Sequence, residues 1–287
     1  KGNVDGAEDL PGLDDMLGGD RFSRGSSMHE PSLAALSDDR FDGLVSCPDL
    51  AAYERPLDEA NEYFLSVSEL RVAQGARDKF DESGRARILP GVSAVAWIEQ
   101  DTRLFEQLSD FAEKLRAEFE EAEVLPYVSF LPHATFHMTV ADIAVWPKAG
   151  VADAVRRETR LAFEDLERRR TSTTSTYVAG VSIYSATSII LRVHPETRDD
   201  LTYLQQIRRT LYGRLEPLGS SKNGAFVGHV TLAYFTQDVP KADYRKVREI
   251  MSRYEREYIG TLQVTRVELR SFEDMEQWSG PLETLEL

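Results

Sequence analysis

The chain has 287 residues, of which 41% are hydrophobic and 29% charged, and its formal net charge at pH 7 is −15. This length allows one large or two small domains with a sizeable core, and no apolar run approaches the roughly 18 residues of a membrane-spanning helix. Proteins that hold long nucleic acids usually present a basic face. The acidic balance therefore argues against a long RNA or DNA partner and favours a small nucleotide or the end of a short oligonucleotide.

The N-terminal segment differs in composition from the rest of the chain. Residues 1–60 contain 14 acidic and 5 basic side chains, and residues 1–50 are rich in Gly, Asp, Ser and Pro. This composition predicts a solvated extension over 1–50, followed by a folded domain over 51–287. The alternative is an arm that packs over the domain or binds a protein partner. The single cysteine, Cys47, excludes a disulfide within the chain and fits a reducing, cytoplasmic location.

Helical and strand patterns alternate along the remainder of the chain. Apolar residues at helical spacing predict helices over 57–76, 104–122, 152–170, 199–215 and 241–254, with Asp101 and Thr102 as N-cap candidates. Strand-like runs cover 92–98, 136–145, 177–193 with a turn near 185–187, 225–235, 261–272 with a shift typical of a β-bulge, and an edge strand at 282–287. Several of these strands are joined by short turns, which argues against a purely parallel sheet. The sequence therefore predicts an α+β fold of antiparallel sheet with helices packed outside.

Two of the predicted strands carry the same short motif. One reads Phe136-His137-Met138-Thr139-Val140, and the other reads Gly228-His229-Val230-Thr231-Leu232. Because residues two apart in a strand point to the same face, each histidine projects together with its threonine. Two such strands along one cleft would supply two imidazoles and two hydroxyls, which is the equipment for acid–base chemistry on a phosphate.

The paired motifs resemble those of the two-histidine (2H) phosphoesterase superfamily. The stretch from Lys79 to Arg85, with Pro90-Gly91 before the strand at 92–98, looks like the start of one less-studied branch of that superfamily. The resemblance covers residues 78–287. It implies two pseudo-symmetric lobes, each with one His-x-Thr strand beside a central cleft. It also implies a metal-independent phosphodiesterase without a cofactor, acting on a 2′,3′-cyclic phosphate, another cyclic nucleotide or a short RNA 3′ end.

Phosphodiester cleavage assigns a role to each motif residue. An imidazole with a pKa of ~6.5 accepts or donates a proton near neutral pH, so His137 and His229 are the predicted general acid and base, in either order. Thr139 and Thr231 are the predicted phosphate contacts.

Three further residues are candidate substrate contacts. His133 forms a second His-x-Thr with Thr135, but Pro132 indicates that the strand has barely begun there, so His137 is favoured as the catalytic residue. A metal site built from His133 and His137 would need a helix, and the surrounding sequence is strand-like, so no metal is predicted. Lys222 and Tyr234 are the other two candidates, against the plainer interpretations of a solvated loop and a core aromatic residue.

A second class of function stays open at this point. The same cleft would serve a non-catalytic nucleotide- or RNA-binding module whose acidic arm contacts a partner. No membrane partner is predicted. Tight binding of a cyclic nucleotide without turnover would favour the binding module over the enzyme.

Overall fold

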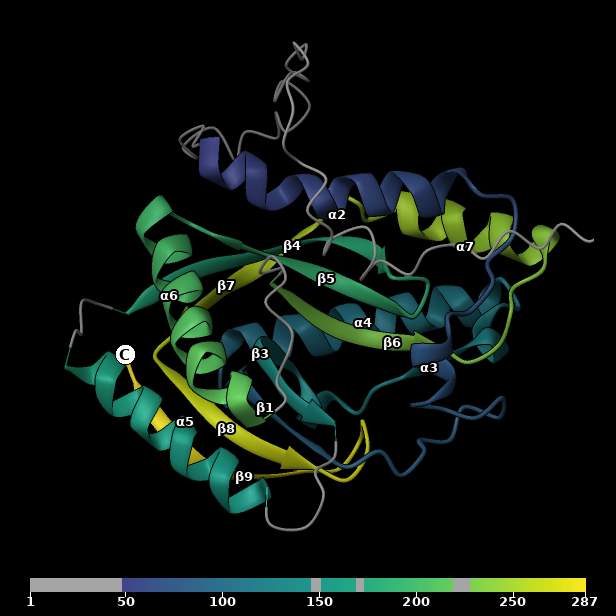
Figure 1. Ribbon diagram of the computed structural model, residues 1–287. Coiled ribbons are helices and arrows are strands. Elements are labelled where there is room, and N and C mark those ends of the chain that lie inside the picture. The colour runs from purple at the N-terminus through teal and green to yellow at the C-terminus, as the bar shows by residue number, and fades with distance from the viewer. Residues whose placement is uncertain (1–47, 146–150, 169–172, 219–227) are drawn as a thin grey trace, which may run out of the picture.

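One antiparallel sheet organises the molecule, as the ribbon of the computed structural model shows (Figure 1). The structure describes residues 48–145, 151–168, 173–218 and 228–287. The predicted extension over 1–50 therefore lies outside the described residues except for 48–50. The candidate contact Lys222 lies outside them as well. The strands are β1 (Gly91–Trp97), β2 (Val128–Phe130), β3 (His137–Val145), β4 (Thr174–Tyr184), β5 (Ser188–Pro195), β6 (His229–Phe235), β7 (Tyr258–Val264), β8 (Arg266–Phe272) and β9 (Trp278–Glu286).

The two motif strands are neighbours at the middle of this sheet. The strand order is β7-β4-β5-β6-β3-β1-β8-β9, with β2 paired to β6. Strands β3 and β6 meet through a single register pair, Met138 with Val230, so the sheet has two halves with one motif in each. The α+β prediction is confirmed, whereas the pseudo-symmetry of the two halves stays a prediction.

Helices cover the sheet from outside. They are α2 (Pro48–Ser66), α3 (Gln74–Arg77), α4 (Arg103–Glu121), α5 (Val151–Glu167), α6 (Arg198–Leu215) and α7 (Lys241–Arg253). Helix α4 begins where the sequence predicts, because the Thr102 side chain accepts a hydrogen bond from the backbone N–H of Phe105 at 3.2 Å. Within the described part of the chain, no helix is both long and apolar enough to cross a membrane.

One face of the sheet carries the main hydrophobic core and the other does not. Met138, Val230 and Leu191 are fully buried in the core that the helices cover. Their strand neighbours point the other way, where two smaller clusters form around Tyr234 and Ile190. Because successive strand residues alternate between faces, this second face is where the motif side chains lie.

Two sequence predictions about secondary structure are wrong. The helix predicted over 57–76 ends at Ser66, because the backbone of Leu70 instead exchanges two hydrogen bonds with Val239, at 3.1 and 2.9 Å. The bulged strand predicted over 261–272 is two strands, β7 and β8, separated by Thr265. Strand β7 pairs with β4 and β8 pairs with β1, so the register shift marks the point where the chain passes from one half of the sheet to the other.

Candidate active site

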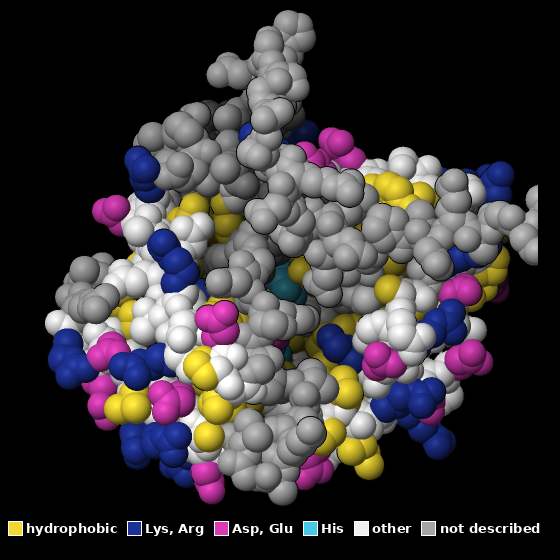
Figure 2. Space-filling view, in the orientation of Figure 1, with side chains coloured by type: hydrophobic (Ala, Val, Ile, Leu, Met, Phe, Trp, Pro, Cys, Tyr) yellow, Lys and Arg dark blue, Asp and Glu magenta, His cyan; other side chains and the backbone are white. Residues whose placement is uncertain are grey.

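The register of β3 and β6 brings the two motifs together. Met138 and Val230 are directly paired and completely buried on the core face. The residues that flank them, His137 with Thr139 and His229 with Thr231, therefore share the opposite face, and all four are half-buried. In an antiparallel pair each histidine lies nearer the threonine of the other motif. A histidine side chain is visible in a hollow near the centre of the face in Figure 2.

The ring of His137 is held in one orientation. Its Nδ1 lies 2.6 Å from the carbonyl oxygen of Thr135, and since a carbonyl oxygen only accepts, Nδ1 carries the proton. The lone pair is then on Nε2. Burial lowers the pKa of His137 from 6.5 to about 4, against the opposing effect of the Thr135 hydrogen bond, and the charges of His229 and Arg270 lower it further. His137 is therefore a neutral imidazole at pH 7.

Aromatic rings and a guanidinium enclose His137. Trp97, its register partner on β1, stacks on the imidazole with 5.5 Å between ring centroids and planes 4° apart. The guanidinium of Arg270 lies 4.0 Å from the centroid of Trp97 and is fixed by a 2.6 Å hydrogen bond to the buried carboxylate of Glu268. Trp278 closes another side, at 4.5 Å from the imidazole. These contacts cover much of the ring surface and explain why burial has the largest effect on its pKa.

His229 has a comparable but more polar setting. Its ring stacks on Tyr184 with centroids 5.0 Å apart. Arg192 is its register partner on β5, and the guanidinium is fixed by the hydroxyl of Ser182, at 2.5 Å, and by the carboxylate of Asp58. A fixed cation thus stands beside each histidine, Arg270 near His137 and Arg192 near His229, which suits an anionic ligand.

The two motif threonines keep their hydroxyls available. Among the described residues, neither Thr139 nor Thr231 has a hydrogen-bond partner for its side chain. Both face the same side as the histidines. They can therefore donate to the non-bridging oxygens of a phosphate that lies between the imidazoles.

Each motif strand bulges at the same place. The register of β3 shifts by one residue after Thr139, and that of β6 shifts after Thr231. Each bulge turns the residue five positions after the histidine onto the motif face, which brings in Asp142 on β3 and Tyr234 on β6. The ring of Tyr234 lies beneath the ammonium group of Lys79, at 4.7 Å from its centroid. Tyr234, a predicted substrate contact, thus lies on the same face as the motif residues.

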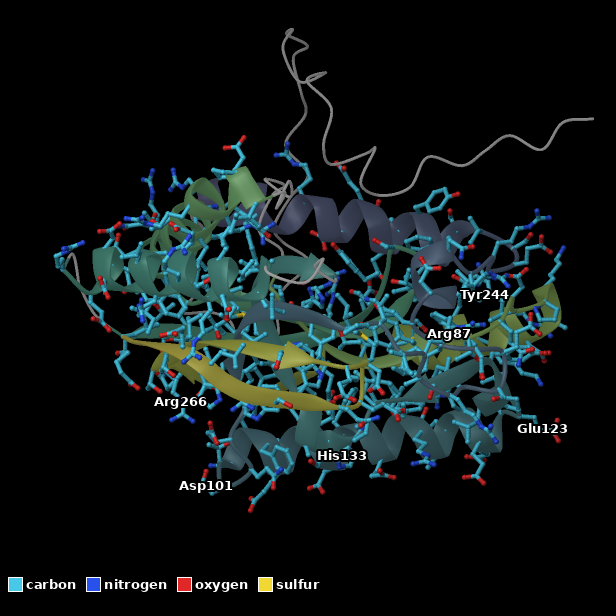
Figure 3. The ribbon with its side chains drawn as sticks, turned by 60° about the horizontal axis from the view of Figure 1, so that its bottom comes forward. Arg87, Asp101, Glu123, His133, Tyr244 and Arg266 are labelled. Atoms are coloured by element: carbon cyan, nitrogen blue, oxygen red, sulfur yellow. The ribbon has the colours of Figure 1, made fainter. Side chains whose placement is uncertain are left out.

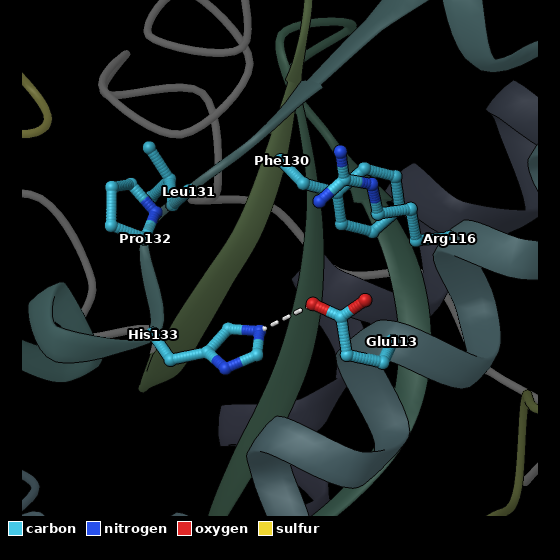
Figure 4. A pocket seen from close by; sticks show the side chains of 6 residues that line it. All are labelled: Glu113, Arg116, Phe130, Leu131, Pro132 and His133. Carbon is cyan, nitrogen blue, oxygen red and sulfur yellow. Dashed lines mark ion pairs between the residues drawn. The ribbon is translucent and has the colours of Figure 1, made fainter.

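His133 lies apart from this arrangement. It begins a 3-10 helix over His133–Thr135, its Nε2 is 3.1 Å from Oε1 of Glu113 on α4, and it stands beside α4 between Asp101 and Glu123 at the two ends of that helix (Figure 3). A shallow pocket there is lined by Glu113, Arg116, Phe130, Leu131, Pro132 and His133 (Figure 4). It contains neither motif histidine, so it is separate from the site. Among the described residues, no group of three or more His, Cys, Asp or Glu side chains is arranged to hold a metal ion.

Several residues of the site were not found from the sequence. Trp97, Arg192 and Arg270 lie on predicted strands without any motif of their own. The signal that could have found them is strand parity combined with the correct pairing of β1, β5 and β8. The pairing of distant strands is not encoded in any local pattern.

Comparison with known proteins supports the family resemblance that the two motifs carry. A family model described as 2H-phosphodiest, a domain of unknown function (DUF1868), matches residues 79–158. This match contains the first motif, and with it the predicted resemblance to the two-histidine phosphoesterase superfamily is confirmed. No curated protein matches the sequence.

Three solved structures are among those similar to this chain. The conserved protein of unknown function ATU0111 from Agrobacterium tumefaciens strain C58 is 15% identical, with a TM-score of 0.53, over 79% of this chain and 97% of its own. Escherichia coli LigT complexed with NADP+ is 13% identical, with a TM-score of 0.43, over 70% and 99%. Usb1 of Kluyveromyces marxianus is 12% identical, with a TM-score of 0.45, over 70% and 99%. The first of these shares the overall fold with this chain.

Proposed function

We propose that this protein is a metal-independent phosphodiesterase of the two-histidine type, which hydrolyses a cyclic nucleotide, a 2′,3′-cyclic phosphate or the 3′ end of a short RNA. The observation that carries this proposal is the placement of His137, Thr139, His229 and Thr231 on one face of the sheet, around the buried pair Met138 and Val230. Two imidazoles and two unused hydroxyls around one space supply each part that in-line displacement at phosphorus requires.

The two histidines have different roles in this proposal. The neutral ring of His137, with its lone pair on Nε2, takes the proton of the attacking water. The water oxygen forms a bond to phosphorus, and the bond from phosphorus to the leaving ribose oxygen breaks. His229 donates a proton to that oxygen. Proton exchange with solvent then restores both rings.

The charges near the motif residues support the same assignment. The negative charge of a bound phosphate raises the pKa of His137 in the complex, toward the range in which a general base is most effective. The threonine hydroxyls and the guanidinium groups of Arg192 and Arg270 stabilise the charge that develops on the non-bridging oxygens. Each imidazole is expected to contribute about 10²- to 10⁴-fold to the rate.

Single substitutions test these roles. His137→Ala and His229→Ala are each expected to lower hydrolysis of the best substrate in a panel of 2′,3′- and 3′,5′-cyclic nucleotides by at least about 100-fold. His133→Ala distinguishes the two interpretations of the first motif, because it removes the imidazole that lies against α4. Loss of hydrolysis with His133→Ala and retention with His137→Ala would contradict the proposal.

Calorimetry separates the enzyme from a binding module. The wild-type protein is expected to turn over the cyclic nucleotide that it binds. If a cyclic nucleotide binds tightly and none of the panel is turned over, the protein is instead a non-catalytic nucleotide-binding module of the same fold.

A further inference from the structure

The sequence stretch that begins at Lys79 connects the two halves of the sheet. Upstream of it, the backbone of Leu70 forms a β-bridge with Val239 just beyond the end of β6. The guanidinium of Arg77 forms a salt bridge with Asp238 at 2.7 Å. Downstream of it, the backbone N–H of Leu89 donates to the carbonyl of Glu273 just beyond β8, at 2.9 Å. The stretch is therefore fixed at both ends, and it passes over the ends of β6 and β8 on the way to β1.

Lys79 is the cation that this stretch brings to the motif face. Its Nζ donates to the hydroxyl of Tyr234 at 3.2 Å. The next residue, Phe80, stacks on the ring of Tyr234 with centroids 5.1 Å apart. Lys79 is half-buried and its side chain is held over the ring, so the position of its ammonium group is set by the fold.

The ammonium group of Lys79 differs from the other cations of the site in its partners. Arg270 is paired with Glu268, and Arg192 is paired with Asp58. Among the described residues no carboxylate forms an ion pair with Lys79, and its one hydrogen-bond partner is the hydroxyl of Tyr234. An ammonium has three N–H donors, so two are left for a ligand. A half-buried cation that has no carboxylate in direct contact can take an anion as its partner.

The position of Lys79 distinguishes it from the groups that hold the reacting phosphate. Thr231 and Tyr234 are paired with Ile190 and Ser188, which are two residues apart on β5, so they lie about 7 Å apart along the strand. Burial alone would lower the pKa of Lys79, but Tyr234 and the charge of Asp142 outweigh it and keep the amine protonated. Asp142 also acts on His137, so Lys79 and His137 lie within electrostatic reach of one carboxylate.

We propose that Lys79 binds a second phosphate group of the substrate, and that the protein therefore prefers nucleotides that carry a phosphate in addition to the diester that is cleaved. This inference rests on the proposed function and adds the class of substrate. A cyclic nucleotide with a terminal phosphate, or a short oligonucleotide whose neighbouring diester reaches Lys79, has this chemistry.

A pair of substrates that differ by one phosphate tests the inference. Adenosine 2′,3′-cyclic phosphate with a 5′-phosphate is expected to have a kcat/KM about 10- to 100-fold above that of the same compound without it, the range for one charged hydrogen-bonded contact. Lys79→Met should remove this preference and leave the unphosphorylated substrate within about 2-fold. Lys241→Met removes the same charge from the exposed start of α7 and should leave the preference intact.

Two results would overturn the inference. One is an equal kcat/KM for both substrates in the wild-type protein. The other is an equal loss for both substrates in Lys79→Met, which would place Lys79 at the reacting phosphate or give it a structural role.

Binding to the His137→Ala/His229→Ala variant keeps the inference separate from catalysis. With this variant as the background, Lys79→Met is expected to weaken the binding of the 5′-phosphorylated compound at least about 10-fold in calorimetry and to leave the other compound unchanged. If the wild-type protein hydrolyses neither compound, the proposed function fails for these substrates, and the binding comparison still decides. Equal binding of both compounds, or binding of neither, would contradict a phosphate site at Lys79.

Discussion

The protonation of His137 is the property of this site that the fold alters most. Its pKa is lowered from 6.5 to about 4, mainly by burial, which corresponds to roughly 3 kcal/mol in favour of the neutral ring. Trp97 covers one face of that ring. Trp97→Leu admits water to this face, so the pKa of His137 is expected to rise toward 6.5. Phe119→Leu, which removes an aromatic ring from the buried side of α4, should leave the pKa of His137 unchanged.

Nuclear magnetic resonance titration of the histidine rings measures this pKa directly. The acid limb of the plot of kcat/KM against pH reports the same group in the free enzyme. The value of kcat/KM should rise as pH passes through about 4. Above about pH 6, His137 should cause no further change in kcat/KM. A wild-type His137 that titrates near 6.5 would refute the reasoning. So would a Trp97→Leu protein in which the pKa of His137 does not change.

The same pKa makes stability depend on pH with a definite sign. The folded state binds a proton at His137 less readily than the unfolded state does, because its pKa is lower when folded. The contribution of His137 to the free energy of unfolding is therefore fully present above about pH 6.5 and is lost as pH falls toward 4. Replacing His137 with Phe should flatten the stability profile in this window.

Two further predictions concern the site and the fold. Thr139→Val and Thr231→Val keep the shape of the side chain and remove the hydroxyl, so each is expected to lower kcat/KM about 10- to 100-fold with little change in the thermal midpoint; unaltered kinetics would remove the threonines from phosphate binding. Gly180 has a φ of +77°, and an added Cβ would lie 2.5 Å from the carbonyl oxygen of Glu255, so Gly180→Ala should destabilise the protein by more than about 1 kcal/mol in urea unfolding. Gly213→Ala is the matched control, because nothing lies within 4 Å of its added Cβ and it is inside α6; a similar loss in both variants would contradict the explanation.

Features with a local cause could be predicted from the sequence. The N-cap at Thr102 depends on one side chain and the next turn of backbone. The turn between β4 and β5 was also expected near residues 185–187, where Ser185 and Ala186 have positive φ. The placement of each motif histidine with its threonine follows from strand parity alone, and the structure bears out that parity in the burial of Met138 and Val230.

Features with a distant cause could not be predicted in this way. The helical spacing after Ser66 was overridden by backbone pairing with Val239, which is more than 160 residues away in sequence. The bulges that bring Asp142 and Tyr234 beside the motifs are visible only in the strand pairing. The position of Lys79 over the ring of Tyr234 could not be predicted either, because Lys79 is far from both motifs along the chain.

Hydrolysis in EDTA tests the central claim most directly. The substrate is adenosine 2′,3′-cyclic phosphate with a 5′-phosphate, and the proteins are the wild type and His137→Ala/His229→Ala, with products followed by ³¹P resonance. The account predicts turnover by the wild-type protein that EDTA does not reduce and that the double substitution abolishes. Turnover that EDTA abolishes, or that persists without both histidines, would contradict it.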